Sequence, residues 1–140
     1  QIKPFYDDVV GDIMNFFENK IRIANGIGIK NDNIILDPGI GFGKRVQDNY
    51  NIIRNLKVFK QLNRRVLVGL SRKSFLSVNN DGPESRLTST IAATVIAMQN
   101  GADILRVHDV EDTYKLIMTI NQFSNENVYR EFNEIWFTGI

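Results

Sequence analysis

Hydrophobic residues recur along the chain in a pattern that alternates between helical and extended spacing. Residues 9–24 carry apolar side chains every three to four positions and Gly26 follows them, which predicts an amphipathic helix. Residues 33–37, 65–70 and 103–108 are short runs of apolar residues, typical of strands that are buried on both faces. The extended runs therefore predict three core strands.

Each predicted strand is followed by a segment with helical spacing. Residues 52–62, 87–98 and 110–123 carry apolar side chains along one face and are expected to form helices. Residues 71–76 are expected to wind a short helix, and residues 79–83 are expected to form a loop. Strands that are apolar throughout need helices packed around a parallel sheet or a barrel. The predicted fold class is therefore α/β.

The chain is expected to divide into one folded unit, residues 1–124, and a tail. Residues 125–140 alternate polar with large apolar residues and are expected to be a last helix or a covering segment. Three parallel strands are few, because a closed (β/α)8 barrel takes about 250 residues. The chain is therefore expected to be part of a larger fold.

Composition removes several classes of function. The 140 residues include 17 Lys and Arg against 16 Asp and Glu, a net charge of +1, so no overall field attracts nucleic acid or an anionic membrane. The absence of cysteine excludes disulfides, a thiolate nucleophile and Cys-ligated metals, and the single histidine excludes an H-E-x-x-H metal site. There is no run of about 18 apolar residues and no basic, apolar leader. We expect a soluble, cytoplasmic protein that binds neither nucleic acid nor membrane.

Polar side chains follow all three predicted strands at their carboxyl ends, where open sheets and barrels place their ligand sites. Asp37 ends the first strand, residues 71–74 follow the second, and Arg106 and His108 end the third. Arg106 and His108 are two residues apart, so on a strand they share one face. A lone histidine is more often a satisfied core residue, but a guanidinium on the same face needs an anionic partner. The pair therefore suits a phosphate.

The segment Ser71-Arg72-Lys73-Ser74 joins a predicted strand to a predicted helix. Free backbone N–H groups, two hydroxyls and two cations in such a turn would hold an anion or a carboxylate. An equally good interpretation is a solvated basic turn in which Ser71 caps the helix. Local sequence does not decide between them.

The glycine-rich segment 37–44 does not match a nucleotide-binding loop. It has one residue too few for G-x-x-x-x-G-K, and Arg45 stands where a Ser or Thr is needed; it is also one residue short of G-x-G-x-x-G. Asp37 either belongs to an ordinary Asp-Pro-Gly turn or offers two acceptors to a flat ligand edge with adjacent N–H donors. A covalent nucleophile is not expected, because neither Ser71 nor Ser74 has a histidine beside it in sequence.

Three motifs together resemble dihydropteroate synthase, a folate-biosynthesis transferase inhibited by sulfonamides. They are DPGIGFGK at 37–44, GLSRKSF at 69–75 and LRVHDV at 105–110, in the family's order and at its usual intervals. Residues 4–10 also resemble the segment that follows the family's fifth barrel strand, so the resemblance runs from the first residue to about Phe123. It implies the C-terminal half of a pterin-binding (β/α)8 TIM barrel, with strands six to eight.

The resemblance implies an activity and a site. The family joins 4-aminobenzoate to 6-hydroxymethyl-7,8-dihydropterin diphosphate and releases diphosphate with the help of magnesium. Asp37 would bind the amino-pyrimidine edge of the pterin, and Lys73 would hydrogen-bond the ring oxygen and nitrogen. Arg106 would flank the ring and reach the diphosphate, which His108 would also bind. The resemblance implies that Lys73, Arg106 and His108 are the catalytic residues.

The same resemblance implies that Phe42, Arg72 and Ser74 border the 4-aminobenzoate pocket. The family's N-terminal half, which carries the magnesium-contacting Asn, two mobile loops and further pterin-binding residues, is absent. We therefore expect this chain alone to be an inactive fragment whose partners are the two substrates and the other half of the barrel, in an enzyme that is a homodimer at full length.

Two other functions remain open at this point. One is a related pterin-binding barrel of the methyltetrahydrofolate–corrinoid methyltransferase type, which has no diphosphate to anchor. The other is a non-catalytic half-barrel that pairs its open edges with another chain, since unpaired edges and exposed apolar faces aggregate.

Overall fold

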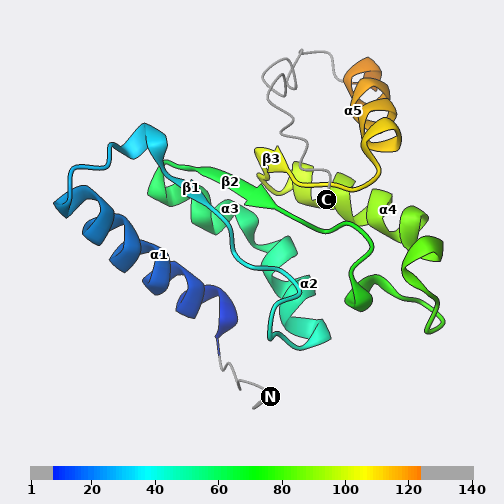
Figure 1. Cartoon of the computed structure of the whole chain (residues 1–140), viewed down its shortest axis with the longest axis horizontal. Coiled ribbons are helices and arrows are strands. Elements are labelled where there is room, and N and C mark those ends of the chain that lie inside the picture. The colour runs from blue at the N-terminus through cyan, green and yellow to red at the C-terminus, as the bar shows by residue number, and fades with distance from the viewer. Residues whose placement is uncertain (1–7, 124–140) are drawn as a thin grey trace.

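The computed structural model describes residues 8–123, in which three parallel strands form one sheet flanked by helices (Figure 1). The strands are β1 (Ile35–Leu36), β2 (Arg65–Val68) and β3 (Ile104–Leu105), in the order β1-β2-β3. The predicted α/β class and the parallel sheet are confirmed. Residues 125–140, the predicted tail, lie outside the described residues.

The register brings the carboxyl ends of the strands to one edge of the sheet. Leu36 is paired with Val66, and Val68 is paired with Leu105. The two outer strands are shorter than the apolar runs that predict them, since each pairs with β2 alone among the described strands. Beyond β3 the chain stays close to β2, because Arg106 N donates to Val68 O at 2.9 Å.

The first helix, α1 (Val9–Gly26), matches its prediction. Asp8 caps it, and its carboxylate accepts a hydrogen bond from Gly11 N at 3.0 Å. The chain leaves the helix through Gly28, whose φ of +89° is costly for other residues. Local capping and glycine chemistry therefore set both ends of α1.

The single helix predicted over residues 52–62 is wrong in its extent. The chain forms α2 (Val46–Arg54), α3 (Leu56–Phe59) and a 3₁₀ turn, η2 (Lys60–Leu62). The break lies at Asn55, whose side-chain amide donates to Asn51 O at 2.8 Å. An Asn side chain that bonds a carbonyl of its own helix competes with the backbone ladder, and here it ends the first helix.

The remaining long helices, predicted over residues 87–98 and 110–123, are confirmed. They are α4 (Leu87–Gln99) and α5 (Val110–Phe123). The short helix predicted over residues 71–76 is only a 3₁₀ turn, because Arg72 takes a left-handed conformation (φ +56°) that cannot continue a helix. The short 3₁₀ elements are η1 (Asn31–Asn33), η3 (Ser74–Leu76) and η4 (Pro83–Arg86).

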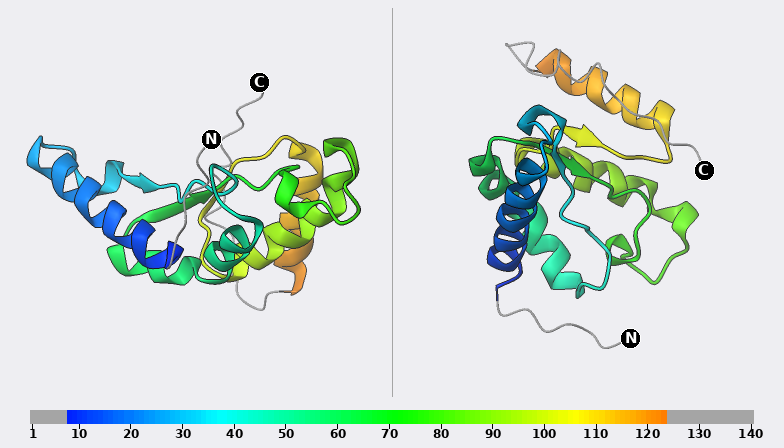
Figure 2. Two further views of the ribbon diagram at one scale, coloured as in Figure 1. Left: turned by 90° about the horizontal axis from the view of Figure 1, so that it is seen from below. Right: turned by 60° about the vertical axis from the view of Figure 1, so that its left-hand side comes forward.

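Helices lie along one side of the strands, as the left view of Figure 2 shows. Leu36, Val66 and Val68 point into the core on that side and are at most 3% exposed. Ile35, which alternates with Leu36, is 42% exposed. The sheet therefore has one well-covered face and one more open face.

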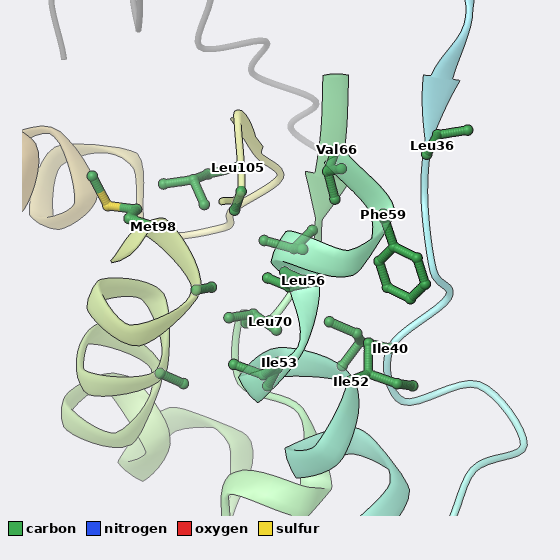
Figure 3. Close-up of a cluster of buried hydrophobic side chains, with 14 of the residues drawn as sticks. Leu36, Ile40, Ile52, Ile53, Leu56, Phe59, Val66, Leu70, Met98 and Leu105 are labelled. Atoms are coloured by element: carbon green, nitrogen blue, oxygen red, sulfur yellow. The ribbon is translucent and has the colours of Figure 1, made fainter. Parts of the chain in front are cut away.

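The core joins side chains from all three strands and from α2, α3 and α4 (Figure 3). Phe59 is fully buried, and the ring of Phe17 meets it edge-on with the centroids 5.4 Å apart, which attaches α1 to the core. Within residues 8–123, no helix is both long enough and apolar enough to cross a bilayer.

Candidate functional site

A cleft of about 500 Å³ opens beside the carboxyl ends of β2 and β3. Four of the predicted site residues line it, and three residues to which the sequence analysis gave no ligand-binding role of their own complete the lining. The cleft residues are Phe42, Gly69, Ser71, Lys73, Arg106, Val107 and His108. The structure therefore brings residues from three distant parts of the chain to one opening.

Arg106 lies across the end of β2, next to the carboxylate that follows β1. Its Nη2 is 3.6 Å from Oδ2 of Asp37. Both side chains are more than a third exposed, so this ion pair is weak and is free to exchange for a ligand. Gly69 makes room for the guanidinium, since a Cβ atom there would lie 3.0 Å from Arg106 Nε. The arginine is thus placed by the shape of the strand end.

Lys73 reaches into the cleft from the turn after β2. Its ammonium donates to the carbonyl of Ile40 and lies 4.3 Å from the centroid of the Phe42 ring. Its alkyl chain packs on Gly41, where φ is +84° and a Cβ atom would lie 2.6 Å from Lys73 Cδ. Burial lowers the pKa of Lys73, and the positive charge of Arg106 lowers it further. The ammonium therefore lies among other positive charges.

The glycine-rich loop under Lys73 is held by Asn49, which sequence reasoning missed. Asn49 is 1% exposed, and its Oδ1 accepts a hydrogen bond from Gly41 N at 2.6 Å. Its Nδ2 donates to Arg45 O at 2.9 Å, so both ends of the amide are used. Lys44 braces the loop from the other side by donating to Gly39 O at 2.8 Å. The contact between Asn49 and the loop exists only in the folded chain, so no local sequence signal marked it.

Three predicted site residues are not among those that line this cleft. Asp37 lies beside it, where it pairs with Arg106. Arg72 turns away and forms a two-bond ion pair with Asp109, in which Nε lies 3.0 Å from Oδ2. Ser74 is exposed at the start of η3. Neither Arg72 nor Ser74 meets Lys73, Arg106 and His108 in the cleft.

The expected cradle of free N–H groups in residues 71–74 is wrong. Arg72 N donates to Thr90 Oγ1 at 3.0 Å, and Lys73 N donates to Leu70 O at 3.2 Å. Ser71 does not cap a helix; its buried hydroxyl accepts from His108 N at 3.3 Å. The turn therefore contributes the Lys73 side chain to the cleft, while the N–H groups of Arg72 and Lys73 form hydrogen bonds within the protein.

The cleft is suited to an anion attached to a polar ring. Lys73, Arg106 and His108 present cationic or N–H donor groups, and Asp37 adds a carboxylate that accepts hydrogen bonds. A fork of guanidinium N–H groups matches phosphate oxygens, and a carboxylate matches two adjacent N–H donors. These groups can bind such a ligand and polarise its bonds, but none of them is a nucleophile.

The expected magnesium ion finds no set of ligands in this part of the chain. Among residues 8–123, no three His, Asp or Glu side chains lie close enough together to hold a metal ion. The carboxylate of Asp37 already accepts from Gly39 N at 2.9 Å and faces Arg106. The described residues therefore do not by themselves fit a magnesium site.

Comparison with known proteins shows the family to which the chain belongs. Residues 1–108 match the family of pterin-binding enzymes. Dihydropteroate synthase of Haemophilus influenzae is 43% identical over 118 residues, which cover 84% of this chain and 43% of that protein.

Solved structures give the same family. Dihydropteroate synthase of Xanthomonas albilineans with 4-aminobenzoic acid superposes with a TM-score of 0.85 at 36% identity, covering 89% of this chain and 46% of that one. The same enzyme with 7,8-dihydropteroate gives a TM-score of 0.85, 36% identity and coverage of 89% and 48%. The chain thus spans less than half the length of these relatives. Over the part that it spans, the chain belongs to the family of pterin-binding enzymes.

Proposed function

We propose that the chain supplies one half of the active site of a dihydropteroate synthase, with β1, β2 and β3 as strands six to eight of an eight-stranded barrel. Three observations support a place in such a barrel, and the order of the three sequence motifs is the ground for strands six to eight. The strands are parallel and in sequential order, helices cover one face, and the site lies at the carboxyl ends. The other strands would come from the part of the fold that its relatives have in addition.

The meeting of Lys73, Arg106 and His108 in one cleft beside Asp37 carries this proposal. Asp37 accepts hydrogen bonds from the amino-pyrimidine edge of the pterin, because its two oxygens match two adjacent N–H donors. Lys73 exchanges its bond to Ile40 O for bonds to the oxygen and nitrogen of the pterin ring. Asp37 and Lys73 therefore orient the ring with its diphosphate toward Arg106.

Arg106 and His108 bind the diphosphate and stabilise it as it leaves. Breaking the bond between the pterin methylene and the diphosphate oxygen gathers negative charge on the leaving group. A guanidinium fixed beside that oxygen lowers the barrier, because it stabilises charge that grows in the transition state. The amine of 4-aminobenzoate attacks the methylene as a neutral nucleophile, and binding both substrates side by side supplies much of the rate.

The 4-aminobenzoate pocket lies on the Phe42 side of the cleft in this proposal. Phe42 lines the cleft and its ring is 66% exposed, which leaves a face for an aromatic ligand. Ser74 lies one residue beyond Lys73, where its hydroxyl can meet a carboxylate at the cleft mouth. The roles of Arg72 and Ser74 in this pocket, and the homodimer of the whole enzyme, stay predictions.

A chimera tests the activity. This chain would replace the 118 aligned residues of the Haemophilus influenzae synthase, and dihydropteroate formation from both substrates would be measured. We expect turnover above that of the Haemophilus remainder alone. A folded chimera that forms no dihydropteroate, when the parent enzyme does under the same conditions, contradicts the proposal.

Pyrophosphate separates the synthase from a corrinoid methyltransferase. A methyltransferase binds no diphosphate, so its substrates would not require a pair such as Arg106 and His108. We expect the chimera to bind pyrophosphate in a calorimetric titration. We also expect the pterin diphosphate to displace the bound pyrophosphate.

Substituting Gly69 with alanine should weaken that binding without removing a charge. The new Cβ would lie 3.0 Å from Arg106 Nε and Nη2, so the guanidinium must move. Because a displaced fork loses its two-bond match to phosphate, we expect pyrophosphate affinity to fall about tenfold. Gly26→Ala is the matched control, because nothing lies within 4 Å of its Cβ position. Equal affinity in Gly69→Ala and wild type would show that the observed Arg106 position is unimportant.

A further inference from the structure

Arg72 has an unusual backbone conformation between two cleft residues. Its φ is +56°, in the left-handed region that costs free energy for a residue with a Cβ atom. Its neighbours Ser71 and Lys73 both line the cleft, while its own side chain points away. The left-handed residue is therefore the turn that presents Lys73 to the cleft.

Three contacts hold this conformation. Thr90 Oγ1 accepts a hydrogen bond from Arg72 N at 3.0 Å, and Arg86 donates to Arg72 O at 3.0 Å. The carboxylate of Asp109 binds the guanidinium by two bonds. Strained residues persist where their surroundings over-determine them, as here.

Asp109 also joins this turn to the other wall of the cleft. It follows His108 directly, and its carboxylate binds the side chain of Arg72, while His108 N donates to the hydroxyl of Ser71, the neighbour of Arg72. The Arg72 guanidinium holds the pKa of Asp109 below its usual range, so the carboxylate stays charged at neutral pH. One carboxylate thus ties the ends of β2 and β3 together.

We propose that Asp109 is a positioning residue, which holds Arg72 in its left-handed conformation and thereby sets Lys73 and His108 on facing walls of the cleft. Asp109 does not line the cleft itself. The proposal deepens the proposed synthase function, on which it rests for the role of Lys73. It differs from the prediction that Arg72 contacts 4-aminobenzoate, because here Arg72 acts through its backbone.

The test begins with Asp109→Asn, which keeps the size of the side chain and removes the ion pair. The Lys73 side chain would be titrated by NMR in the ¹³C-lysine-labelled chain, with Lys73→Gln to identify its signal. Lys73 faces Arg106, Lys44 and Asp37. If Asp109→Asn lets the turn relax, Lys73 leaves these charges and its burial, and its pKa rises toward the ordinary lysine value. In the chimera, we expect pyrophosphate affinity to fall about 5- to 30-fold, the ratio equivalent to the cost of a left-handed residue.

A second substitution makes the test specific. Glycine takes a positive φ at no steric cost, so Arg72→Gly should keep the turn without the ion pair. We therefore expect Arg72→Gly/Asp109→Asn to restore both the lowered pKa of Lys73 and pyrophosphate affinity to near wild type. If the double variant is no better than Asp109→Asn, or if Arg72→Gly alone is as impaired, the positioning role is overturned.

A control variant is needed, and the outcomes must distinguish failure of the positioning role from failure of the proposed synthase function. Glu111→Ala removes an exposed acid that pairs with Lys115 in α5, and it should leave the pKa of Lys73 unchanged. An unchanged Lys73 in Asp109→Asn, in a chimera that makes dihydropteroate, overturns the positioning role alone. The other outcome is that the pKa of Lys73 shifts in Asp109→Asn and is restored in the double variant, but the chimera makes no dihydropteroate. That outcome supports the positioning role, and the synthase proposal fails.

Discussion

Replacing Arg106 with alanine is expected to lower kcat/KM for dihydropteroate formation by about 100- to 1000-fold in the chimera. The guanidinium is a permanent cation at the proposed place of the leaving diphosphate, and its ion-pair partner Asp37 is 3.6 Å away. Its charge is therefore available to the transition state. Because the negative charge grows as the bond breaks, kcat should fall together with kcat/KM, and KM should change less.

Two further variants separate charge from geometry. Arg106→Lys keeps a positive charge but loses the fork, so it should recover only part of the lost rate. Arg54→Ala removes an exposed arginine of α2 and should leave kcat/KM within about twofold of wild type. If Arg106→Ala retains more than a tenth of wild-type kcat/KM, the leaving group does not depend on Arg106 and the assigned mechanism is wrong.

The general α/β organisation could be predicted because it depends on periodicity that is continuous along the chain. Helix α1 has a capping Asp8 and a terminal glycine, and α4 and α5 have long apolar stripes, so their limits agree with prediction within a residue or two. The helix limits in the chain after Arg45 were harder to predict. There the apolar stripe continues through Asn55, but a side-chain bond to Asn51 O ends the helix, and periodicity does not report such a competing bond.

The site was predictable as far as it depends on strand ends. Asp37, Lys73, Arg106 and His108 follow apolar runs, and parallel strands bring such positions to one edge. The orientation of each side chain was not predictable in the same way. Arg72 and Lys73 are adjacent cations, yet one faces Asp109 and the other the cleft, because a positive φ separates them.

The supporting residues of the site were the hardest to find. Asn49 reaches the glycine-rich loop across eight residues, and Asp109 reaches Arg72 across 37. Each acts through a contact that exists only once the fold is formed, so no local pattern marks it. A sequence therefore shows the groups that meet a ligand more readily than the groups that hold them in place.

Replacing Phe59 with alanine is expected to lower the free energy of unfolding of this chain by about 3–5 kcal/mol. The ring is fully buried between α1 and the sheet, and Phe17 meets it edge-on at 5.4 Å. The substitution loses the burial of the ring and leaves a cavity that the surrounding helices fill only in part. Since small domains are stable by only about 5–15 kcal/mol, a large share of the stability would be lost. Urea unfolding followed by far-UV circular dichroism measures the change.

Phe16→Ala is the matched control, since it removes the same type of side chain from an exposed position of α1, next to Phe17. The Phe16 ring is 55% exposed and lies under Lys20, so its removal should cost less than about 1 kcal/mol. A double-mutant cycle with Phe17→Ala should show coupling of about 0.5–1.5 kcal/mol between Phe17 and Phe59. Equal losses in Phe16→Ala and Phe59→Ala would mean that α1 does not pack on the sheet through this face. In that case β1, which α1 precedes in the chain, would have no fixed support, and Asp37 would not be held beside Arg106.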